Sequence, residues 1–236
     1  MTITDQMLGP LLRADPARPR ITHYDDAAGS RVELSGATLA NWAAKTANWL
    51  RDELDVQPGD PVAVLLPPHW QSAGVLLGAW WCGATVTPSA TGARVALCAP
   101  ERLTEASEAD ELAVLRLDAM GRGIATPPPG VRDFVSEVRV HGDTFQPDRA
   151  GPDAERVLHS ARTRAEQLAL SAGDRLLCTT SWDATVPGEV LLAVLATDAS
   201  LVQCTAADLT ALPHRCEVER VSATLGVDVP PVRRAG

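Results

Sequence analysis

The stretch that decides the fold runs from Leu34 to Pro88, and it reads LSGATLANWAAKTANWLRDEL (34–54), DVQPGDPVAVLLPPHW (55–70) and QSAGVLLGAWWCGATVTP (71–88). In the first piece apolar residues recur every three or four positions, which predicts an amphipathic helix over 38–54. A continuous apolar strand over 62–66 and an almost entirely apolar helix over 71–82 follow. Gly83 ends that helix, and 84–87 returns to a strand. This βαβ order predicts a parallel sheet with a right-handed crossover.

The helix predicted over 38–54 has one apolar and one polar face. The apolar face comprises Leu39, Trp42, Ala43, Thr46, Trp49, Leu50 and Leu54. Lys45, Asn48, Arg51 and Asp52 lie on the opposite face, which we expect to be exposed to solvent. Lys45 is the only lysine among the 236 residues. Its position favours an ordinary surface residue over a catalytic cation.

The rest of the first half alternates in the same way. The predicted elements are a helix over 4–15, a hairpin of strands at 20–24 and 31–34, a strand at 94–99, a helix over 101–110 and a strand at 112–117. Residues 126–130 (TPPPG) form a stiff connector, which we take as the boundary between two subdomains, 1–130 and 131–236. Residues 132–140 are predicted as a strand, or as a short helix and a strand.

The second half repeats the alternation after a predicted loop over 141–152. The expected elements are a helix over 154–168, a strand at 175–180, a helix over 187–197, a strand at 200–204, a helix over 206–212 and a strand at 221–225. The pattern therefore predicts an α/β fold with two mainly parallel-sheet subdomains and flanking helices.

Composition and charge exclude several classes of protein. The net charge of −9 argues against a nucleic-acid partner or an anionic membrane surface. The longest apolar run, 73–84, is too short to cross a bilayer. No basic segment followed by an apolar run begins the chain, so we expect no signal peptide and a cytoplasmic location.

The cysteines and histidines do not have the spacing of a metal site. The five cysteines are far apart without a C-x-x-C pair, and the five histidines are scattered. Since most of the cysteines stand in apolar patterns, we expect buried, reduced thiols and no metal.

Several motifs resemble those of the adenylate-forming superfamily, which includes acyl-CoA synthetases, non-ribosomal peptide adenylation domains and luciferases. VQPGDPVAV (56–64) is similar to the family's V-x-x-G-D-x-V-A-V strand entry, and GATVTP (83–88) to its G-A-x-x-x-P helix end. In the second half, SAGDRLL (171–177), ASLV (199–202) and ERVS (219–222) resemble its G-P-G-D-R-V-L, A-S-V-V and E-R-V-T segments. The resemblance implies the large N-terminal domain of an acyl-CoA synthetase in shortened form.

The chain departs from the family where ATP phosphates would bind. Family enzymes carry a T-S-G-T-T-G-x-P-K loop there, whose glycines let backbone N–H groups approach phosphate while Lys adds charge. The corresponding stretch here is VHGDTFQPDRAGP (140–152). It keeps only Gly142, Thr144 and Gly151 as remnants, lacks lysine, and carries aspartates that would repel phosphate. The family's adenine and ribose motifs and its C-terminal domain also have no counterpart.

The loop Thr179–Thr180–Ser181–Trp182–Asp183 follows a predicted strand, and open α/β sheets bind ligands at such strand ends. It is either the remnant of a small-molecule cleft or an ordinary polar loop. No G-x-S-x-G elbow surrounds Ser181, so we assign no catalytic residue. Trp70 follows two prolines and a histidine, and is the tryptophan best placed at a contact surface, although a buried position suits it too.

These observations predict a non-catalytic homologue of AMP-forming acyl-CoA synthetases that serves as a protein- or ligand-binding scaffold without a cofactor. Apolar surface left uncovered would favour a homodimer or a protein partner. One alternative is an acyl- or aryl-adenylating subunit that needs a partner chain and binds ATP or AMP. The other is a small-molecule binder without turnover, with a small carboxylate or nucleotide as its ligand.

Overall fold

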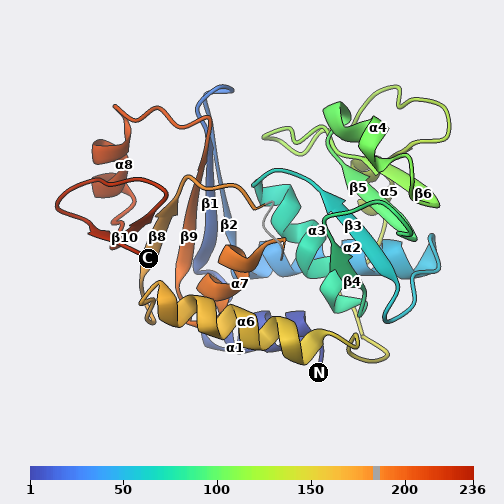
Figure 1. Cartoon of the computed structure of the whole chain (residues 1–236), viewed down its shortest axis with the longest axis horizontal. Helices are drawn as coiled ribbons and strands as arrows, with labels where there is room; N and C mark the ends of the chain where they lie inside the picture. Colours follow the sequence, from blue (N-terminus) through green and yellow to red (C-terminus); the bar gives the residue numbers. More distant parts are fainter. Residues whose placement is uncertain (183–186) are drawn as a thin grey trace.

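The computed structural model describes residues 1–182 and 187–236, which form two sheets with helices between and around them (Figure 1). The first sheet has the strand order β11-β10-β8-β9-β1-β2. Its strands are β1 (Pro19–Asp25), β2 (Ser30–Ser35), β8 (Arg175–Cys178), β9 (Ser200–Thr205), β10 (Ala223–Leu225) and β11 (Arg233–Arg234). The second sheet has the order β4-β3-β5-β6-β7. Its strands are β3 (Pro61–Leu65), β4 (Thr85–Thr87), β5 (Val95–Cys98), β6 (Glu111–Val114) and β7 (Arg132–Asp133).

Most of the helices lie where the apolar patterns of the sequence predict them. They are α1 (Ile3–Ala14), α2 (Gly36–Asp52), α3 (Trp70–Trp81), α4 (Leu103–Ala106), α5 (Phe134–Val138), α6 (Ala154–Gln167), α7 (Glu189–Ala196) and α8 (Leu212–Val218), with a single 3₁₀ turn at Pro100–Arg102. Polar side chains begin four of them. Thr2 forms a capping box with Asp5, and the side chains of Ser35, His69 and Asp133 accept backbone N–H groups at the starts of α2, α3 and α5.

Strand pairing confirms the predicted α/β fold. The β1–β2 hairpin is antiparallel, and the other pairs described are parallel. The unit β3–α3–β4 is the βαβ unit expected from the sequence, with Val62 opposite Val86. Both sheets are thus built mainly from parallel strands with helical crossovers.

The sheets do not divide at residue 130, where the two subdomains were predicted to meet. The N-terminal hairpin joins the later strands, with Ile21 of β1 opposite Leu201 of β9. In the other direction, β7 pairs with β6 and so belongs to the first-half sheet. The pairing of β1 with β9 joins segments far apart in the sequence, so local sequence patterns could not predict it.

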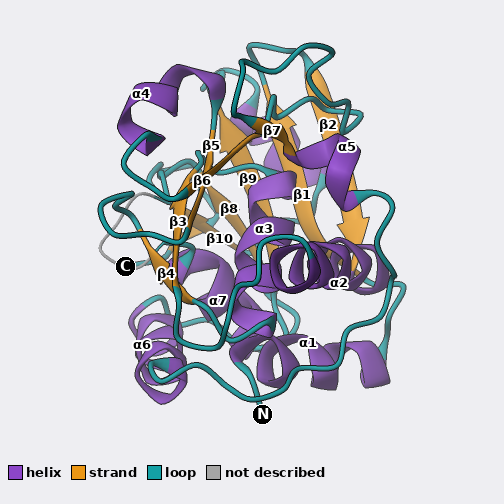
Figure 2. Cartoon of the chain, turned by 90° about the vertical axis from the view of Figure 1, so that its right-hand side faces the viewer, coloured by secondary structure: helices purple, strands orange, loops and turns teal. Residues whose placement is uncertain are grey.

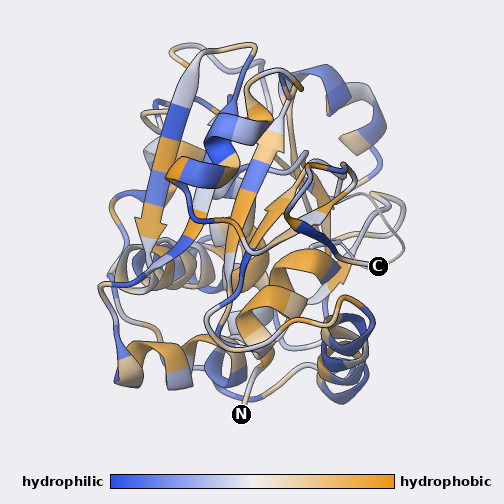
Figure 3. Ribbon diagram, turned by 90° about the vertical axis from the view of Figure 1, so that its left-hand side faces the viewer, coloured by the Kyte–Doolittle hydropathy of each residue, from blue (hydrophilic) through white to orange (hydrophobic). Residues whose placement is uncertain are grey.

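The helix α3 lies between the two sheets and is the centre of the core (Figure 2). It contacts β1 and β2 of one sheet and β3 and β4 of the other, and it packs along α2. From Trp70 to Trp80 every residue of α3 is buried, as its almost uniform apolar composition predicts. Figure 3 shows the contrast with α6, whose outer side is hydrophilic while α7 beside it is hydrophobic.

The predicted helix over 206–212 is wrong, because the helix α8 begins at Leu212 instead. Ala206 has a positive φ of 48°, which an L-residue cannot keep within a helix. The carboxylate of Asp208 then accepts the Thr210 N–H in a local turn. Pro213 stands in the first turn of α8, where a missing N–H costs nothing.

Two shorter predictions also differ from the structure. The helix expected over 101–110 is reduced to a 3₁₀ turn and the one-turn helix α4. In 132–140 the strand precedes the helix, as β7 and then α5, because the side chain of Asp133 accepts the Ser136 N–H and begins the helix there.

We expect Gly78→Ala to destabilise the fold by about 1 to 3 kcal/mol, which is typical of overpacking. A Cβ at this position of α3 would lie 2.8 Å from the Ala43 carbonyl oxygen, a backbone atom that cannot rotate away. Urea unfolding followed by circular dichroism measures the change.

Gly36→Ala at the start of α2 is the matched control, because its Cβ would meet nothing closer than the Pro16 carbonyl oxygen at 3.4 Å, an ordinary van der Waals distance. Alanine favours a helix over glycine, so this variant should be as stable as the parent or up to ~1 kcal/mol more stable. Equal effects of the two substitutions would contradict the close approach of α2 and α3.

Candidate functional site

A cavity of about 180 Å³ lies where β3, β8 and β9 end. Its lining comprises Pro68, Thr179, Thr180, Ser181, Gln203, Cys204, Thr205, Ala206 and Ala207. Thr179, Thr180 and Ser181 are three of the residues predicted from the sequence. Asp183, the last residue of that prediction, lies outside the described residues. Polar side chains therefore meet at the carboxyl ends of parallel strands, which is where α/β sheets bind ligands.

Trp182 does not line this cavity but supports it from behind. It is buried, and its indole N–H donates to Gln203 Oε1 at 3.1 Å. The amide nitrogen of Gln203 then donates to the Thr180 carbonyl at 3.2 Å. Gln203 thus joins the ends of β8 and β9, with both its amide oxygen and its amide nitrogen engaged. The cavity has a neutral polar wall held in one geometry, suited to hydrogen bonds rather than to ion pairing.

Two buried histidines lie next to this cavity, although the sequence analysis did not select them. The rings of His23 in β1 and His69 at the start of α3 are 4.5 Å apart, edge to face. His23 Nε2 is 3.0 Å from Thr205 Oγ1, and Thr205 donates its own hydroxyl proton to the Tyr24 carbonyl. His23 therefore carries its proton on Nε2. Only long-range strand pairing brings these residues together, so local motifs give no sign of them.

Burial keeps both histidines neutral. It lowers the pKa of His23 from 6.5 to about 4, with the charge of Asp25 acting in the opposite direction. Burial also lowers the pKa of His69 to about 3, and neighbouring His23 adds to the effect. A proton on either ring would place a charge in the core beside the other ring.

Residues 139–146, which contain the predicted phosphate-loop remnants Gly142 and Thr144, bind α2 and do not line this cavity. Lys45 Nζ donates to the His141 carbonyl at 2.6 Å and pairs with the Asp143 carboxylate at 2.7 Å. Asn48 Nδ2 donates to the carbonyls of Gly142 and Thr144, at 3.1 and 2.9 Å. Gly142 and Thr144 are thus held through their carbonyl groups. Carbonyl oxygens would repel a phosphate.

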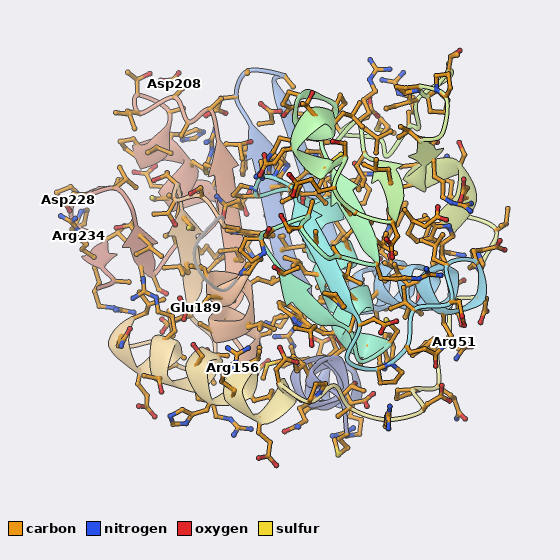
Figure 4. All side chains as sticks on the ribbon, turned by 45° about the vertical axis from the view of Figure 1, so that its right-hand side comes forward. Arg51, Arg156, Glu189, Asp208, Asp228 and Arg234 are labelled. Atoms are coloured by element: carbon orange, nitrogen blue, oxygen red, sulfur yellow. The ribbon has the colours of Figure 1, made fainter. Side chains whose placement is uncertain are left out.

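The polar face of α2 was predicted to be exposed to solvent, but in the structure another segment of the chain covers it. Lys45 is half-buried and Asn48 is buried, because residues 139–146 cover them. Arg51 extends the contact, with its guanidinium 4.6 Å from the Phe145 ring centre and 3.3 Å from the Gln146 carbonyl (Figure 4). The polar face is a docking face for another part of the same chain, which helical periodicity alone cannot distinguish from exposure to solvent.

Gly151, the third remnant of the loop, has a packing role. A Cβ there would lie 2.4 Å from the Gly83 carbonyl oxygen, and one on Gly83 would lie 2.9 Å from the Arg149 carbonyl oxygen. The two backbones pass so closely that only glycine fits at both positions. None of the residues 140–152 lines the cavity beside Thr179, so the structure does not bring the predicted remnant cleft and the degenerate phosphate-loop region together.

Neither a metal site nor a membrane span is found in the described ranges 1–182 and 187–236. No three His, Cys, Asp or Glu side chains there are grouped to hold a metal ion. No helix of that part of the chain combines the length and the apolar character required to cross a bilayer. The five cysteines are buried and unbridged.

Comparison with known families gives a match to the AMP-binding enzyme family over residues 13–167, more than half of the chain. The chain belongs to the AMP-binding enzyme family. A curated relative from Mycobacterium tuberculosis (strain ATCC 25618 / H37Rv), described as a TIGR03089 family protein, is 48% identical over 240 residues. That alignment covers 95% of this chain and 98% of the relative.

Solved structures of longer proteins share the fold of this AMP-binding family member. An acyl-CoA synthetase from Brucella canis superposes with a TM-score of 0.75 at 17% identity over 96% of this chain and 47% of its own. The anthranilate CoA ligase AuaEII, solved with anthranoyl-AMP, gives 0.74 at 14% identity, covering 96% and 49% of the two chains. A Mycobacterium tuberculosis fatty acyl CoA synthetase gives 0.72 at 18%, covering 95% and 49%. The chain thus spans about half the length of these enzymes, and the predicted family and fold are confirmed.

We expect the free energy of unfolding of this family member to fall as the pH falls from 6.5 to 5. The two histidines are neutral in the folded state but bind protons below pH 6.5 once unfolded, so acid favours the unfolded state. Each contributes a slope of at most about 1.4 kcal/mol per pH unit, and the stability is fully present above pH 6.5. Urea unfolding at pH 7.5, 6.0 and 5.0 measures the slope.

The control for this prediction is Thr104→Val, which changes an exposed residue without a titratable group. This variant should leave the slope unchanged, while His23→Gln should reduce it. A parent protein with the same stability at pH 7.5 and 5.0 would contradict the buried neutral pair.

Proposed function

We propose that this chain is a non-adenylating member of its family that binds a small molecule at the cavity beside Thr179–Ser181. The observation that carries the proposal is the attachment of residues 139–146 to α2 through Lys45 and Asn48. The only lysine of the chain is engaged there. The segment that aligns with the family's phosphate loop therefore offers carbonyl oxygens and carboxylates where an ATP site requires donors and cations.

The chemistry of adenylation explains why this arrangement matters. A carboxylate must approach the α-phosphate of ATP, so two anions meet while further charge develops on pyrophosphate. Enzymes that transfer phosphoryl groups offset such charge with positioned cations and N–H donors, which supply most of the catalysis. Asp143 is paired with Lys45, and Asp148 adds a further negative charge to this segment. These groups support loss of adenylation by the chain acting alone.

The strand-end cavity supports a retained binding role. Its polar groups are neutral, and the buried amide of Gln203 is fixed by Trp182 and by the Thr180 carbonyl. At about 180 Å³ it is smaller than most drug-sized pockets, so it suits a small polar molecule or the polar end of a larger one. A cytoplasmic location belongs to the same proposal, because five free cysteines suit a reducing compartment.

We expect no carboxylate-dependent exchange of pyrophosphate into ATP by the purified chain, tested with a panel of aliphatic and aromatic acids and Mg²⁺. A full-length acyl-CoA synthetase serves as the positive control. Exchange above background that disappears in the Lys45→Met variant would overturn the proposal, since that result would make Lys45 catalytic. Exchange that appears only with a second protein chain would favour an adenylating subunit.

We expect a ligand of the cavity to raise the midpoint of thermal unfolding by roughly 5 to 10 °C at a hundred times its dissociation constant. The probes are AMP, ATP–Mg²⁺, CoA and a panel of small amides and carboxylic acids. Thr180→Val should abolish the shift without changing the unliganded midpoint by more than about 3 °C, because it exchanges one wall hydroxyl for a methyl group.

Thr104→Val is the matched control, since Thr104 is exposed in α4 and lines no part of the cavity. This variant should keep the full ligand-induced shift. A shift that survives Thr180→Val would place the ligand elsewhere, and absence of a shift with every probe would remove the binding part of the proposal.

A further inference from the structure

The strand β2 is the edge of its sheet and has a cavity beside it. It pairs with β1 on one side, and no strand of the described residues pairs with it on the other. Figure 2 shows β2 as the right-hand border of its sheet, above α2. A cavity of about 420 Å³ touches all of residues 31–34 of β2. Neighbouring residues of a strand point to opposite faces, so a cavity touching all four lies against the strand's edge, where unpaired backbone N–H and C=O groups are exposed.

The floor of this cavity is aromatic. Trp42 of α2 and Trp70 of α3 both line it, with ring centres 5.2 Å apart and planes at 68°. Trp70 is only 4% exposed, and its indole N–H has no hydrogen-bond partner in the part of the chain that the structure describes. An unpartnered donor in so buried a residue costs free energy.

The opposite wall of the cavity is the turn at 118–122, which hydrogen bonds within the chain hold in place. Asp118 accepts the N–H groups of Met120 and Arg122, and Gly121 packs against the Trp70 ring. Arg139 donates to the Gly121 carbonyl at 2.6 Å and fixes the turn from outside. Met120, 75% exposed, is thereby held beside the two tryptophans. A preformed wall lowers the entropic cost of binding.

The cavity continues along α2 toward a cation. A second cavity of about 260 Å³ shares Thr38 and Trp42 with the first and reaches Arg139. Lys45 and Asp143 in this second cavity neutralise one another at 2.7 Å. Arg139 is exposed, and no carboxylate among residues 1–182 and 187–236 lies within ion-pair distance of it. We name the two joined cavities the edge groove.

We propose that the edge groove binds an extended peptide segment of a partner protein as an additional strand on β2. Its backbone pairs with the free edge, one apolar side chain lies among Trp42, Trp70 and Met120, and an acidic residue reaches Arg139. Strand addition of this kind takes affinity from main-chain hydrogen bonds and specificity from pockets for alternate side chains. The inference goes beyond the proposed function and does not depend on it.

The shape of the groove favours a peptide over a second copy of this chain. Trp42 and Met120 line the cavity together with residues 31–34 of β2, so they stand beside the free edge of that strand. In a dimer formed through β2, the second copy would bring its own Trp42, Trp70 and Met120 to the same edge. A single extended peptide carries no such neighbouring elements. Charge favours an acidic partner segment, because Arg139 is the groove cation without a carboxylate partner in the described part of the chain.

The test is selection of random decapeptides displayed on phage against the immobilised full chain. We expect enriched sequences to have bulky apolar residues at alternate positions and an acidic residue near one end. Synthetic peptides of these sequences, labelled with fluorescein, should bind in fluorescence anisotropy. Met120→Glu should weaken that binding about tenfold or more and Arg139→Gln about threefold, the latter being typical of an exposed ion pair. Both side chains are exposed, so these variants should fold, as circular dichroism would verify.

A peptide methylated on alternate backbone nitrogens separates strand addition from other modes of binding. When the methyl groups replace the N–H groups that face β2, affinity should fall at least tenfold, because each lost hydrogen bond is worth about 1 kcal/mol. Leu209→Glu, a substitution at another exposed apolar residue, should leave affinity within twofold.

Three results would overturn the proposal. They are the absence of any enriched sequence family, equal affinity for Met120→Glu and the parent, and equal affinity of methylated and unmethylated peptides. Concentration-dependent self-association in sedimentation that Met120→Glu abolishes would also overturn it, in favour of a second copy of the chain.

Discussion

Because Gly78 has no side chain, α3 can approach α2 until the space for a Cβ is filled by Thr46 and the Ala43 carbonyl. This contact uses the apolar face of α2 and leaves its other face pointing away from the core. Lys45 and Asn48 stand on that outer face, so they are available to bind residues 139–144. The same contact places Trp42 beside Trp70. The attachment of residues 139–146 to α2, which we call the α2 clamp, and the floor of the edge groove are thus two consequences of one helix–helix contact.

The junction of the two sheets is more polar than a core of this size requires. Gln71 is 1% exposed, and neither atom of its amide group has a partner in the described residues. His23 Nδ1 and the Trp70 indole N–H are also unpartnered there. Buried groups of this kind each cost about 1 to 3 kcal/mol. Pro68 lines the strand-end cavity and Trp70, two residues later, lines the edge groove, so the two candidate binding regions approach one another at the start of α3.

Local patterns were sufficient for some parts of the molecule and insufficient for others. The βαβ unit over 61–87 and the β1–β2 hairpin follow from periodicity and turn residues, and so did the position of Thr179–Ser181 at a strand end. The pairing of β1 with β9, by contrast, joins Ile21 to Leu201. Gln203, His23 and Thr205 reach the cavity only through that pairing, so no motif selects them. Lys45 was misplaced for a related reason, since a polar helix face looks the same in sequence whether water or another segment covers it.

The α2 clamp on residues 139–146 bears on the proposal that this chain does not adenylate. A lysine that donates to two backbone carbonyls and an aspartate is neutralised locally, and it cannot stabilise a phosphate without leaving them. Converting this region into a phosphate site would require release of Lys45, removal of Asp143 and reversal of the carbonyls that Asn48 holds. These groups support one another, so replacement of one alone leaves the others in place. The α2 clamp therefore acts as a unit, and α2 gains from it the hydrogen bonds that its polar face requires.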